Sequence, residues 1–543
     1  MGFSRKNPTV GLKTHILSYK MCGILILHLR KEQKDLDRIC EGYTMLSNRG
    51  PDQGSLTIKS NNNLGGSLIL GFRRLAIVDT STLGMQPFSY GGAQMVCNGE
   101  IYNHHHLKNI YNIKCVSQSD CECILPLFFK LGFENLVQVL NGDFAFAISY
   151  NKKIYYARDR MGVRPLFHGI TSNGNFALAS YARALTSYCS TVNAIPPGWG
   201  IYDSISFTMV NQYFPLTLGP ILITNAEKNV RETLTLSIKD RLMTDRPMGC
   251  LLSGGLDSSL ITSIICKLVG PSNVRTYSIG MEGSIDLKYA KTVAEYLGTH
   301  HTEILFTPQE GFDAIPDVIR DLESYDITTI RASVAMWLGA KYIAKHTDDI
   351  VLFSGEGADE LFCGYLYFHH APSMEALQHE SIRLLKELYL YDVLRADRCI
   401  SSHGLELRVP FLDRRLIDIC LSLEGKDKAP KGGLEKDLLR RAFQDDYIPL
   451  EVLLRRKDGM SDGVSGSGGK KWCDQISDFV HAQISQEEFE PYEEDYPSIE
   501  AYYYKKIYDK IFPTYQPIYN YWMPRWIDHN GDPSGRNLEI FNT

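Results

Sequence analysis

A glycine-rich stretch in the middle of the 543-residue chain has the residue types of a phosphate-binding loop. An apolar run ending at Leu252 leads into Ser253-Gly254-Gly255-Leu256-Asp257-Ser258, and apolar residues then recur at helical spacing. The glycines let the backbone approach phosphate, the N–H groups of the helix start attract anions, and the serines add hydroxyl donors. A Walker A loop is excluded, because it needs a lysine that this loop lacks. The alternative is a glycine-rich turn with a serine cap.

A second strand, loop and helix start is expected over 350–360, with Glu356 and Asp359 in its loop. If the two strands belong to one parallel sheet, their carboxyl ends lie at the same edge, and Asp257 and Asp359 come close together. Two such acids could share a Mg²⁺ ion over one pyrophosphate. Taken alone, Asp359 also fits an acid at a helix start, which the helix dipole favours.

The first 200 residues place a cysteine and several charged side chains around short apolar strands. Cys22 opens the run 24–29, and polar loops follow around 49–52, 98–103 and 119–120. Loops on a rigid scaffold are where sites are built. An α-amine on a cysteine is a base matched to neutral pH, so an N-terminal cysteine could act as a nucleophile. A cysteine by itself is more often a buried strand residue.

Short strands and turns dominate the chain from 22 to about 205. Strands are expected over 68–72 and 75–78, and helices near 35–46 and 121–131. This pattern indicates sheets covered by helices.

A connector rich in proline and glycine is expected over 206–225, with Asn225 as the cap of the next helix. Strand and helix patterns alternate from 226 to about 515, which is typical of a parallel sheet with helices on both faces. Ligands bind at the carboxyl ends of the strands in such a sheet. Residues 516–543 are expected to form an aromatic tail. The stretch 502–526 is rich in Tyr and Trp, whose side chains suit docking on the core or on a subunit interface.

Composition narrows the class of protein further. The net charge of −6 argues against a general nucleic-acid surface, and no run is apolar enough to predict a membrane span. Thirteen irregularly spaced cysteines without zinc spacing favour a reducing compartment, and so a cytoplasmic protein. Residues 1–21 are basic and lack an apolar core, so they do not predict a secretory signal.

The sequence from Cys22 to about 205 resembles the class II glutamine amidotransferase domain of the N-terminal-nucleophile family, which implies an αββα sandwich. Four motifs occur in the same order: Met21-Cys22-Gly23-Ile24, Arg49-Gly50-Pro51-Asp52, Arg74-Leu75-Ala76-Ile77-Val78-Asp79 and Asn98-Gly99-Glu100-Ile101-Tyr102-Asn103. In that family a cysteine at the first position attacks the side-chain amide of glutamine and releases ammonia. The resemblance implies the following roles: Cys22 as nucleophile, Asn98 and the Gly99 N–H as oxyanion hole, Arg74 for the glutamine carboxylate, and Glu100 and Asp120 for its ammonium group.

The glycine-rich loop resembles that of the N-type ATP pyrophosphatases, which cleave ATP between the α- and β-phosphates. Together with the first domain, this makes nearly the whole chain similar to the glutamine-hydrolysing asparagine synthetase family, and implies an α/β parallel-sheet second domain. The resemblance assigns ATP to Leu251, Leu252, Ser253, Gly254, Gly255, Asp257, Ser258, Ile279, Ser354, Gly355 and Lys457, with Asp257 and Asp359 on Mg²⁺. It assigns the acceptor end to Thr328, Thr329, Arg331, Glu356 and Lys436.

The implied enzyme takes glutamine, aspartate and ATP as its small-molecule substrates and forms a homodimer. Lys457 would offset charge on the reacting α-phosphate, and ammonia would pass between the two sites inside the protein. A peptide nitrogen is not a base, so glutaminase activity implies a chain that starts at Cys22, either by translation from Met21 or by cleavage of the head.

Three other classes of protein share parts of this pattern. A β-lactam-forming synthetase has the same architecture but lacks the working cysteine. Thiouridine synthetases use paired cysteines and a basic surface that this chain lacks. A regulatory relative with a blocked glutaminase is supported only by the head.

Overall fold

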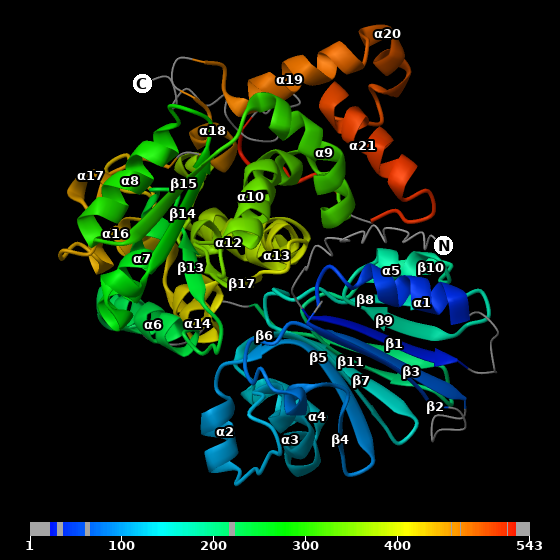
Figure 1. Ribbon diagram of the computed structural model, residues 1–543. Coiled ribbons are helices and arrows are strands. Elements are labelled where there is room, and N and C mark those ends of the chain that lie inside the picture. Colours follow the sequence, from blue (N-terminus) through cyan, green and yellow to red (C-terminus); the bar gives the residue numbers. More distant parts are fainter. Residues whose placement is uncertain are drawn as a thin grey trace, which may run out of the picture.

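The computed structural model describes residues 22–29, 36–50, 52–59, 66–216, 223–457, 459–466, 469–517 and 520–527. Two domains follow one another along the chain, the first in blue and cyan and the second from green through orange to red in Figure 1. The expected basic head and the last part of the aromatic tail lie outside the described residues. Within the described ranges, no helix combines the length and the apolar character that a membrane crossing requires.

The first domain contains two antiparallel sheets of six strands each. One has the order β10-β8-β9-β1-β3-β2, and the other β12-β11-β7-β6-β5-β4. The strands of the first sheet are β1 (Gly23–Leu29), β2 (Gln53–Lys59), β3 (Ser67–Arg74), β8 (Phe167–Ile170), β9 (Phe176–Ala179) and β10 (Thr191–Ala194). Those of the second are β4 (Phe88–Tyr90), β5 (Ala93–Ile101), β6 (Gly142–Tyr150), β7 (Lys153–Arg158), β11 (Gly198–Asp203) and β12 (Thr208–Tyr213).

Alternating side chains decide how these sheets pack. In β1, Ile24 and Ile26 join an apolar cluster with Val96 of β5, whereas Leu25 and Leu27 face the cluster on the other side of the sheet. Helices cover the outer faces, as Figure 1 shows. These helices are α1 (Leu36–Met45) and α5 (Arg183–Thr186) on one sheet, and α2 (His104–Ile110), α3 (Ile124–Leu131) and α4 (Phe133–Val139) on the other.

Three segments differ from the sequence-based expectation. Residues 98–101, expected in a loop, belong to strand β5 and pair with β6, because their backbone groups complete that ladder. Residues 75–78 are not a strand, because the backbone N–H and C=O of Leu75 both pair with the Cys22 thiol and the Ala76 N–H donates to Asp52. These backbone groups are therefore not available for hydrogen bonds to a neighbouring strand. In addition, β12 lies within the stretch expected as a connector, where it pairs with β11 at the edge of its sheet.

The second domain is built on a parallel sheet with the order β15-β14-β13-β16-β17. Its strands are β13 (Met248–Leu251), β14 (Arg275–Gly280), β15 (His300–Leu305), β16 (Val351–Phe353) and β17 (Glu406–Arg408). The chain leaves β13 toward β14 on one side and returns to β16 on the other. Such a reversal of strand order opens a crevice at the carboxyl ends, here between the loops that follow β13 and β16.

Helices surround this sheet, and several begin with the caps that their sequences favour. Asn225 caps the first by accepting from the Lys228 N–H, as expected, and Thr307 and Glu310 form a capping box. The longer helices are α6 (Ala226–Asp240), α7 (Leu256–Val269), α8 (Ile285–Leu297), α9 (Pro308–Leu322), α10 (Ile327–His346), α12 (Met374–Glu387), α13 (Asp392–Ser401), α14 (Arg414–Ser422), α19 (Trp472–Gln483) and α21 (Ile499–Ile511). The short ones are α11 (Ala358–Leu361), α15 (Gly425–Lys428), α16 (Asp437–Ala442), α17 (Leu450–Leu453), α18 (Met460–Gly463) and α20 (Gln486–Phe489).

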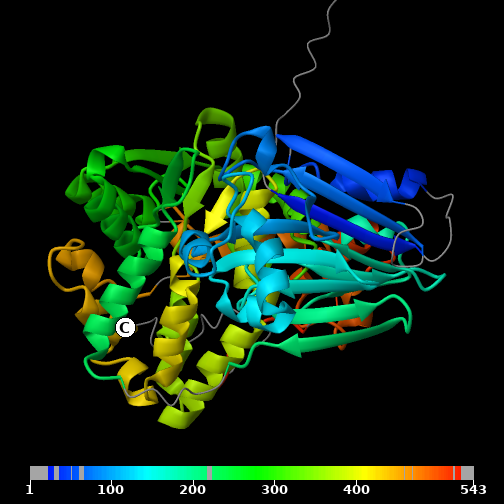
Figure 2. The same ribbon diagram turned by 90° about the horizontal axis from the view of Figure 1, so that it is seen from below.

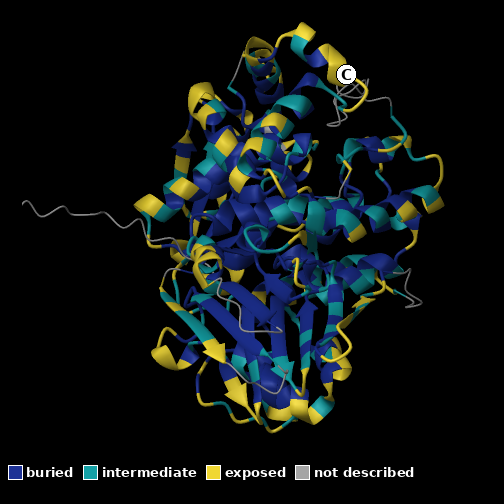
Figure 3. Ribbon diagram, turned by 90° about the vertical axis from the view of Figure 1, so that its right-hand side faces the viewer, coloured by how far each residue is buried: buried dark blue, intermediate teal, exposed yellow. Residues whose placement is uncertain are grey.

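The two domains meet through buried charge as well as apolar packing. Asp397, on α13 of the second domain, accepts from Arg49 at 2.9 Å and from Arg164 at 3.1 Å, both in the first domain. All three side chains are fully buried or nearly so. Seen from below, the strands of the first domain lie directly beside the second domain (Figure 2), and buried residues continue from one domain into the other (Figure 3).

This interface predicts a large effect of a single charge change. Asp397→Asn removes the carboxylate that two buried guanidinium groups share, and leaves Arg164 only the more distant Glu406, at 3.7 Å. Removing one partner of a buried pair typically costs about 3–5 kcal/mol. We expect a clear fall of the midpoint of urea unfolding, followed by circular dichroism.

The matched control is Asp418→Asn, because Asp418 pairs with Arg160 at 2.6 Å but is 39% exposed. Exposed pairs contribute about 1 kcal/mol or less. An Asp397→Asn midpoint no lower than that of the control would show that this network does not hold the domains together.

Candidate functional site

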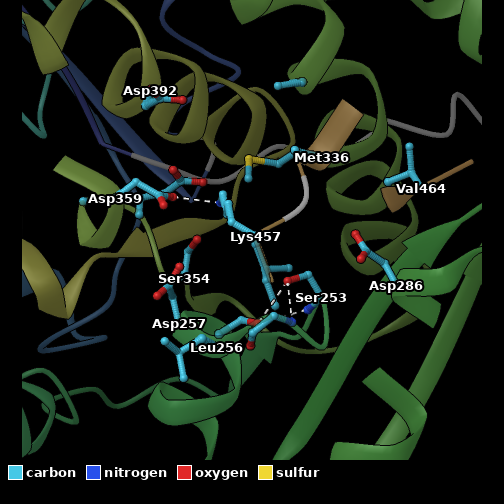
Figure 4. Close-up of a pocket in the computed structure, with 18 of the residues that line it drawn as sticks. Ser253, Leu256, Asp257, Asp286, Met336, Ser354, Asp359, Asp392, Lys457 and Val464 are labelled. Atoms are coloured by element: carbon cyan, nitrogen blue, oxygen red, sulfur yellow. Dashed lines mark hydrogen bonds and ion pairs between the residues drawn. The ribbon is translucent and has the colours of Figure 1, made fainter. Parts of the chain in front are cut away.

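The loop between β13 and α7 is folded as a cradle. The Ser258 hydroxyl accepts from the Ser253 N–H at 3.2 Å and lies 3.0 Å from the Ser253 hydroxyl. Gly254 has φ of +69°, and a Cβ there would lie 2.4 Å from the backbone nitrogen of Ala290, so only glycine fits. Ser253, Gly255 and the first residues of α7, Leu256–Ser258, line one space, part of which is drawn in Figure 4. The first N–H groups of a helix have no partner within the helix and are available to an anion there.

That space is a cavity of about 320 Å³ at the carboxyl ends of the strands. Gly254 does not line it and acts only through the turn. Every other second-domain residue predicted from the sequence does: Leu251, Leu252, Ser253, Gly255, Asp257, Ser258, Ile279, Thr328, Thr329, Arg331, Ser354, Gly355, Glu356, Asp359, Lys436 and Lys457.

Two lysines and two aspartates meet in the middle of this cavity. Lys436 contacts Asp257 and lies 2.8 Å from Asp359 Oδ1, while Lys457 lies 2.8 Å from Asp359 Oδ2. Figure 4 shows the contact between Lys457 and Asp359. Burial acts to raise the pKa of Asp359, but the two lysines hold it well below its usual range. The Lys457 pKa is raised, since Asp359 and Asp257 outweigh burial.

The two aspartates are suited to a magnesium ion that also binds phosphate. Both carboxylates contact the same lysine, and the buried Asp257 Oδ1 has no hydrogen-bond partner. Mg²⁺ is usually bound by one or two carboxylates together with substrate phosphates, so this pair fits it. Within the part of the chain that the structure describes, no group of three or more His, Cys, Asp or Glu is arranged to hold a metal without such a substrate.

The start of α10 forms another wall of the cavity. The side chain of Asp326 caps this helix, accepting from the Thr329 N–H at 2.9 Å and from both threonine hydroxyls at 328 and 329. Arg331, one turn later, is held by a two-pronged contact with Glu500 of α21, at 2.8 and 2.6 Å. Its charge is therefore already partnered.

The sequence-based prediction missed an acidic corner of the same cavity. The Tyr365 hydroxyl donates to Glu360 at 2.6 Å and to Asp392 at 3.3 Å. Burial raises the pKa of Glu360 to about 8, with further contributions from Asp392 and Asp359. Arg395 compensates part of this charge, because it pairs with Asp392 at 2.8 Å and with Glu356 at 3.0 Å. Glu360 adjoins Asp359 and could have been found by extending that motif, whereas Asp392 comes from a helix with no local signal.

A second candidate site surrounds Cys22 in the first domain. The thiol pairs with the N–H and C=O of Leu75, both at 3.3 Å, and the Cys22 carbonyl accepts from Arg49 at 2.8 Å. Burial raises the pKa of the thiol far above its ordinary value. The charge of Glu100 raises it further, and Arg74 lowers it. The motifs predicted to surround Cys22 therefore lie within electrostatic reach of it.

The remaining predicted residues of this site lie along β5 and the turn near 120. The amide oxygen and nitrogen of Asn98 are buried without a partner, as is Oε2 of Glu100. Such groups are costly unless a ligand satisfies them. Gly99 has φ of +139°, and a Cβ would clash with the Asp143 carbonyl. Asp120 accepts from the Ile101 N–H at 2.5 Å, next to Glu100.

Arg74 differs in detail from its expected role. Its guanidinium donates to the carbonyls of Asp79 and Ser81 and to Gln53 Oε1 at 3.0 Å. In this structure it organises the 75–81 loop that carries Leu75 against the thiol.

Family comparisons agree with this division into two sites. A glutamine amidotransferase domain model matches residues 21–210, and an asparagine synthase model matches 229–383 and 371–527. Proteins named asparagine synthetase [glutamine-hydrolyzing] from mouse, human and chicken are each 40% identical over 565 aligned positions, covering 96% of this chain and 99% of theirs. The chain belongs to the asparagine synthetase family, with a glutamine amidotransferase domain followed by an asparagine synthase domain.

Proposed function

We propose that this protein makes L-asparagine from L-aspartate, with glutamine as the nitrogen donor and ATP cleaved to AMP and pyrophosphate. The observation that carries this proposal is the single cavity that joins the Ser253–Ser258 cradle to the cluster around Asp359 and to the acidic corner. A nucleotide phosphate chain and an amino-acid acceptor then meet beside two lysines. The first domain, in the proposed αββα form of N-terminal-nucleophile hydrolases, supplies ammonia.

The proposed nucleotide site runs from the apolar end of the cavity to the cradle. Leu251, Leu252 and Ile279 offer an apolar surface to the adenine base, and Gly255, Ser354 and Gly355 allow close approach of the backbone. The cradle holds the β- and γ-phosphates, which leave as pyrophosphate. A magnesium ion held by Asp257 and Asp359 would supply further positive charge to those phosphates.

The first chemical step is transfer of the adenylyl group. A β-carboxylate oxygen of aspartate attacks the α-phosphorus, the bond from this phosphorus to the bridging oxygen breaks, and pyrophosphate carries away the electron pair. Negative charge builds on the α-phosphate oxygens, where Lys457 and Lys436 stabilise it because both are fixed by Asp359 before substrate arrives.

In the second step ammonia attacks the carbonyl carbon of β-aspartyl-AMP. The C–N bond forms, AMP leaves with the electrons of the C–O bond, and one proton of the attacking nitrogen must be removed. Glu356 lines the cavity and is the carboxylate best placed to take that proton, since Arg395 holds it at 3.0 Å. Thr328, Thr329 and Arg331 form the wall beside the acceptor.

We further propose that the acidic corner binds the α-ammonium group of aspartate. Glu360 and Asp392 share the Tyr365 hydroxyl and line the cavity. A cation placed there offsets the cost of burying the Glu360 carboxylate, whereas Asp392 is partly exposed and already paired with Arg395.

In the first domain, Cys22 is the proposed nucleophile toward the side-chain amide of glutamine. The unpartnered Asn98 amide and the Gly99 N–H are suited to the oxyanion, and Glu100 with Asp120 to the substrate ammonium. Arg74 adds positive charge for the carboxylate. The mechanism needs a free α-amine on Cys22, so we propose that the working chain begins there. Amino-terminal sequencing of active, glutamine-using enzyme that found Met1 would contradict this.

Ammonia is proposed to travel between the sites within the protein. α13 lies between them, because Asp397 on this helix binds Arg49, which holds the Cys22 carbonyl, while Asp392 and Arg395 line the synthetase cavity. Transfer through bulk water would protonate ammonia and destroy its nucleophilicity.

Cys22→Ala should abolish asparagine formation from glutamine and leave formation from ammonium within about twofold, because only the first site uses the thiol. The measurement is asparagine and AMP release with each nitrogen source. Cys40→Ala, at an exposed cysteine, is the control and should change neither rate. Loss of the ammonium reaction in Cys22→Ala would contradict separate sites.

Lys457→Met should lower pyrophosphate release with ammonium by about 10²–10³-fold, the usual loss for one preorganised charge stabiliser. Glutamine hydrolysis by the first domain should persist. Lys470→Met removes an exposed lysine paired with Asp478 and should behave as wild type. Equal rates of pyrophosphate release in the two variants would show that Lys457 takes no part in the reaction.

The acidic corner predicts a pH-dependent KM for aspartate. Burial raises the pKa of Glu360 to about 8. The ammonium group binds the ionised form, which becomes more abundant as pH rises. KM for aspartate should therefore fall by about tenfold per pH unit below 8 and level off above it. Glu360→Gln should raise KM and flatten the profile between pH 6.5 and 8.5. A wild-type profile that is already flat would place the ammonium elsewhere.

A further inference from the structure

The C-terminal segment 520–527 reaches the same cavity, through Trp522. Four contacts fasten this segment to the second domain. The Tyr391 hydroxyl donates to the Asn520 carbonyl at 2.6 Å, and Arg383 to the Met523 carbonyl at 3.2 Å. The Trp522 N–H donates to Asp326 at 2.7 Å, and Arg525 pairs with Glu380 at 3.1 Å.

The contact with Asp326 ties the segment to the acceptor wall. One oxygen of this buried carboxylate, Oδ2, caps α10 and binds both threonine hydroxyls, while the other, Oδ1, accepts from the Trp522 N–H. The same side chain thus fixes the positions of Thr328, Thr329 and the Trp522 backbone.

The indole also contacts the group that organises the acidic corner. Its ring centre lies 5.7 Å from that of Tyr365, whose hydroxyl bridges Glu360 and Asp392. The ring centre of Tyr367 lies 6.3 Å from that of Trp522, and the ring centre of Trp526 lies 6.0 Å from that of Tyr367. The Trp522 indole is therefore part of a larger aromatic cluster. Because contacts hold both the backbone and the ring of Trp522, this large side chain cannot easily move to make room for a longer ligand.

We propose that Trp522 sets the size of the acceptor, so that the cavity takes a four-carbon acidic amino acid and rejects one with an additional methylene. This inference rests on the proposed function. Such discrimination is needed because the first site releases one glutamate for each ammonia. The enzyme itself therefore produces a five-carbon analogue of aspartate in an amount equal to the ammonia that the second site uses. Apolar contact with one additional methylene changes binding only modestly, so a yielding pocket would discriminate poorly between the two amino acids. A rigid wall excludes the longer one by steric clash.

The test compares L-aspartate with L-glutamate as acceptor, with ammonium and Mg-ATP, by pyrophosphate release. In Trp522→Ala, kcat/KM for aspartate should fall through a higher KM, and the aspartate-to-glutamate ratio of kcat/KM should drop at least tenfold. Trp522→Phe should retain most of the discrimination. If the alanine variant does not fold, Trp522→Leu, which keeps apolar packing but is shorter, takes its place and should show the same direction.

Trp526→Ala is the matched control, because Trp526 belongs to the same docked segment but does not line the cavity. It should leave the ratio unchanged. An unchanged ratio in the Trp522 variants, or an equal drop in Trp526→Ala, would overturn the proposal. Wild-type protein that releases no pyrophosphate with aspartate would instead overturn the proposed function, so the two failures are distinct.

Discussion

The arrangement of the two sites depends on one buried carboxylate. Asp397 accepts from two arginines of the other domain, and one of them, Arg49, also donates to the Cys22 carbonyl. Burial acts to raise the pKa of Asp397, but Arg49 and Arg164 lower it below its usual value. A charge-assisted network without access to water has few alternative geometries, because each altered contact leaves a buried ion unpaired. It therefore fixes the orientation of the domains as well as their association.

The helix that carries Asp397, α13, also contributes residues to the synthetase cavity. α13 presents Asp397 to the glutaminase side and Arg395 and Asp392 to the synthetase cavity, within two turns of helix. Arg49 and Glu356, which belong to different sites, are therefore both held by side chains of this one helix. The charge of Glu406, on β17 of the second domain, also acts on the first site, where it adds to the rise in the pKa of both Cys22 and Glu100.

Local signals predicted the parts of the structure that depend on neighbours in sequence. The Ser253–Ser258 cradle and the Asn225 cap follow from glycine freedom and side-chain capping, and both are found where expected. The strand expected over 75–78 was wrong, because a short apolar run also occurs outside strands, and here the backbone hydrogen bonds go to Cys22 and Asp52. The pattern of apolar residues in a segment does not show which groups its backbone will hydrogen-bond to.

The other features that could not be predicted from the sequence depend on contacts between residues far apart along the chain. Arg331 meets Glu500 across 169 positions, and Asp326 meets Trp522 across 196, with no pattern in either segment that names the other. The aromatic tail was recognised from composition, but docking on the core or on another subunit could not be distinguished. The acidic corner was missed because Tyr365, which unites Glu360 and Asp392, has no motif of its own.

The most direct test of the two-site account follows the nitrogen atom. Enzyme with a free Cys22 amine is supplied with aspartate, Mg-ATP and glutamine labelled with ¹⁵N in its amide, in the presence of excess unlabelled ammonium. Internal transfer predicts asparagine that retains most of the label, with AMP formed in equal amount. Label diluted to the ratio of the bulk solution would show that ammonia leaves the protein between the sites, and would contradict the account.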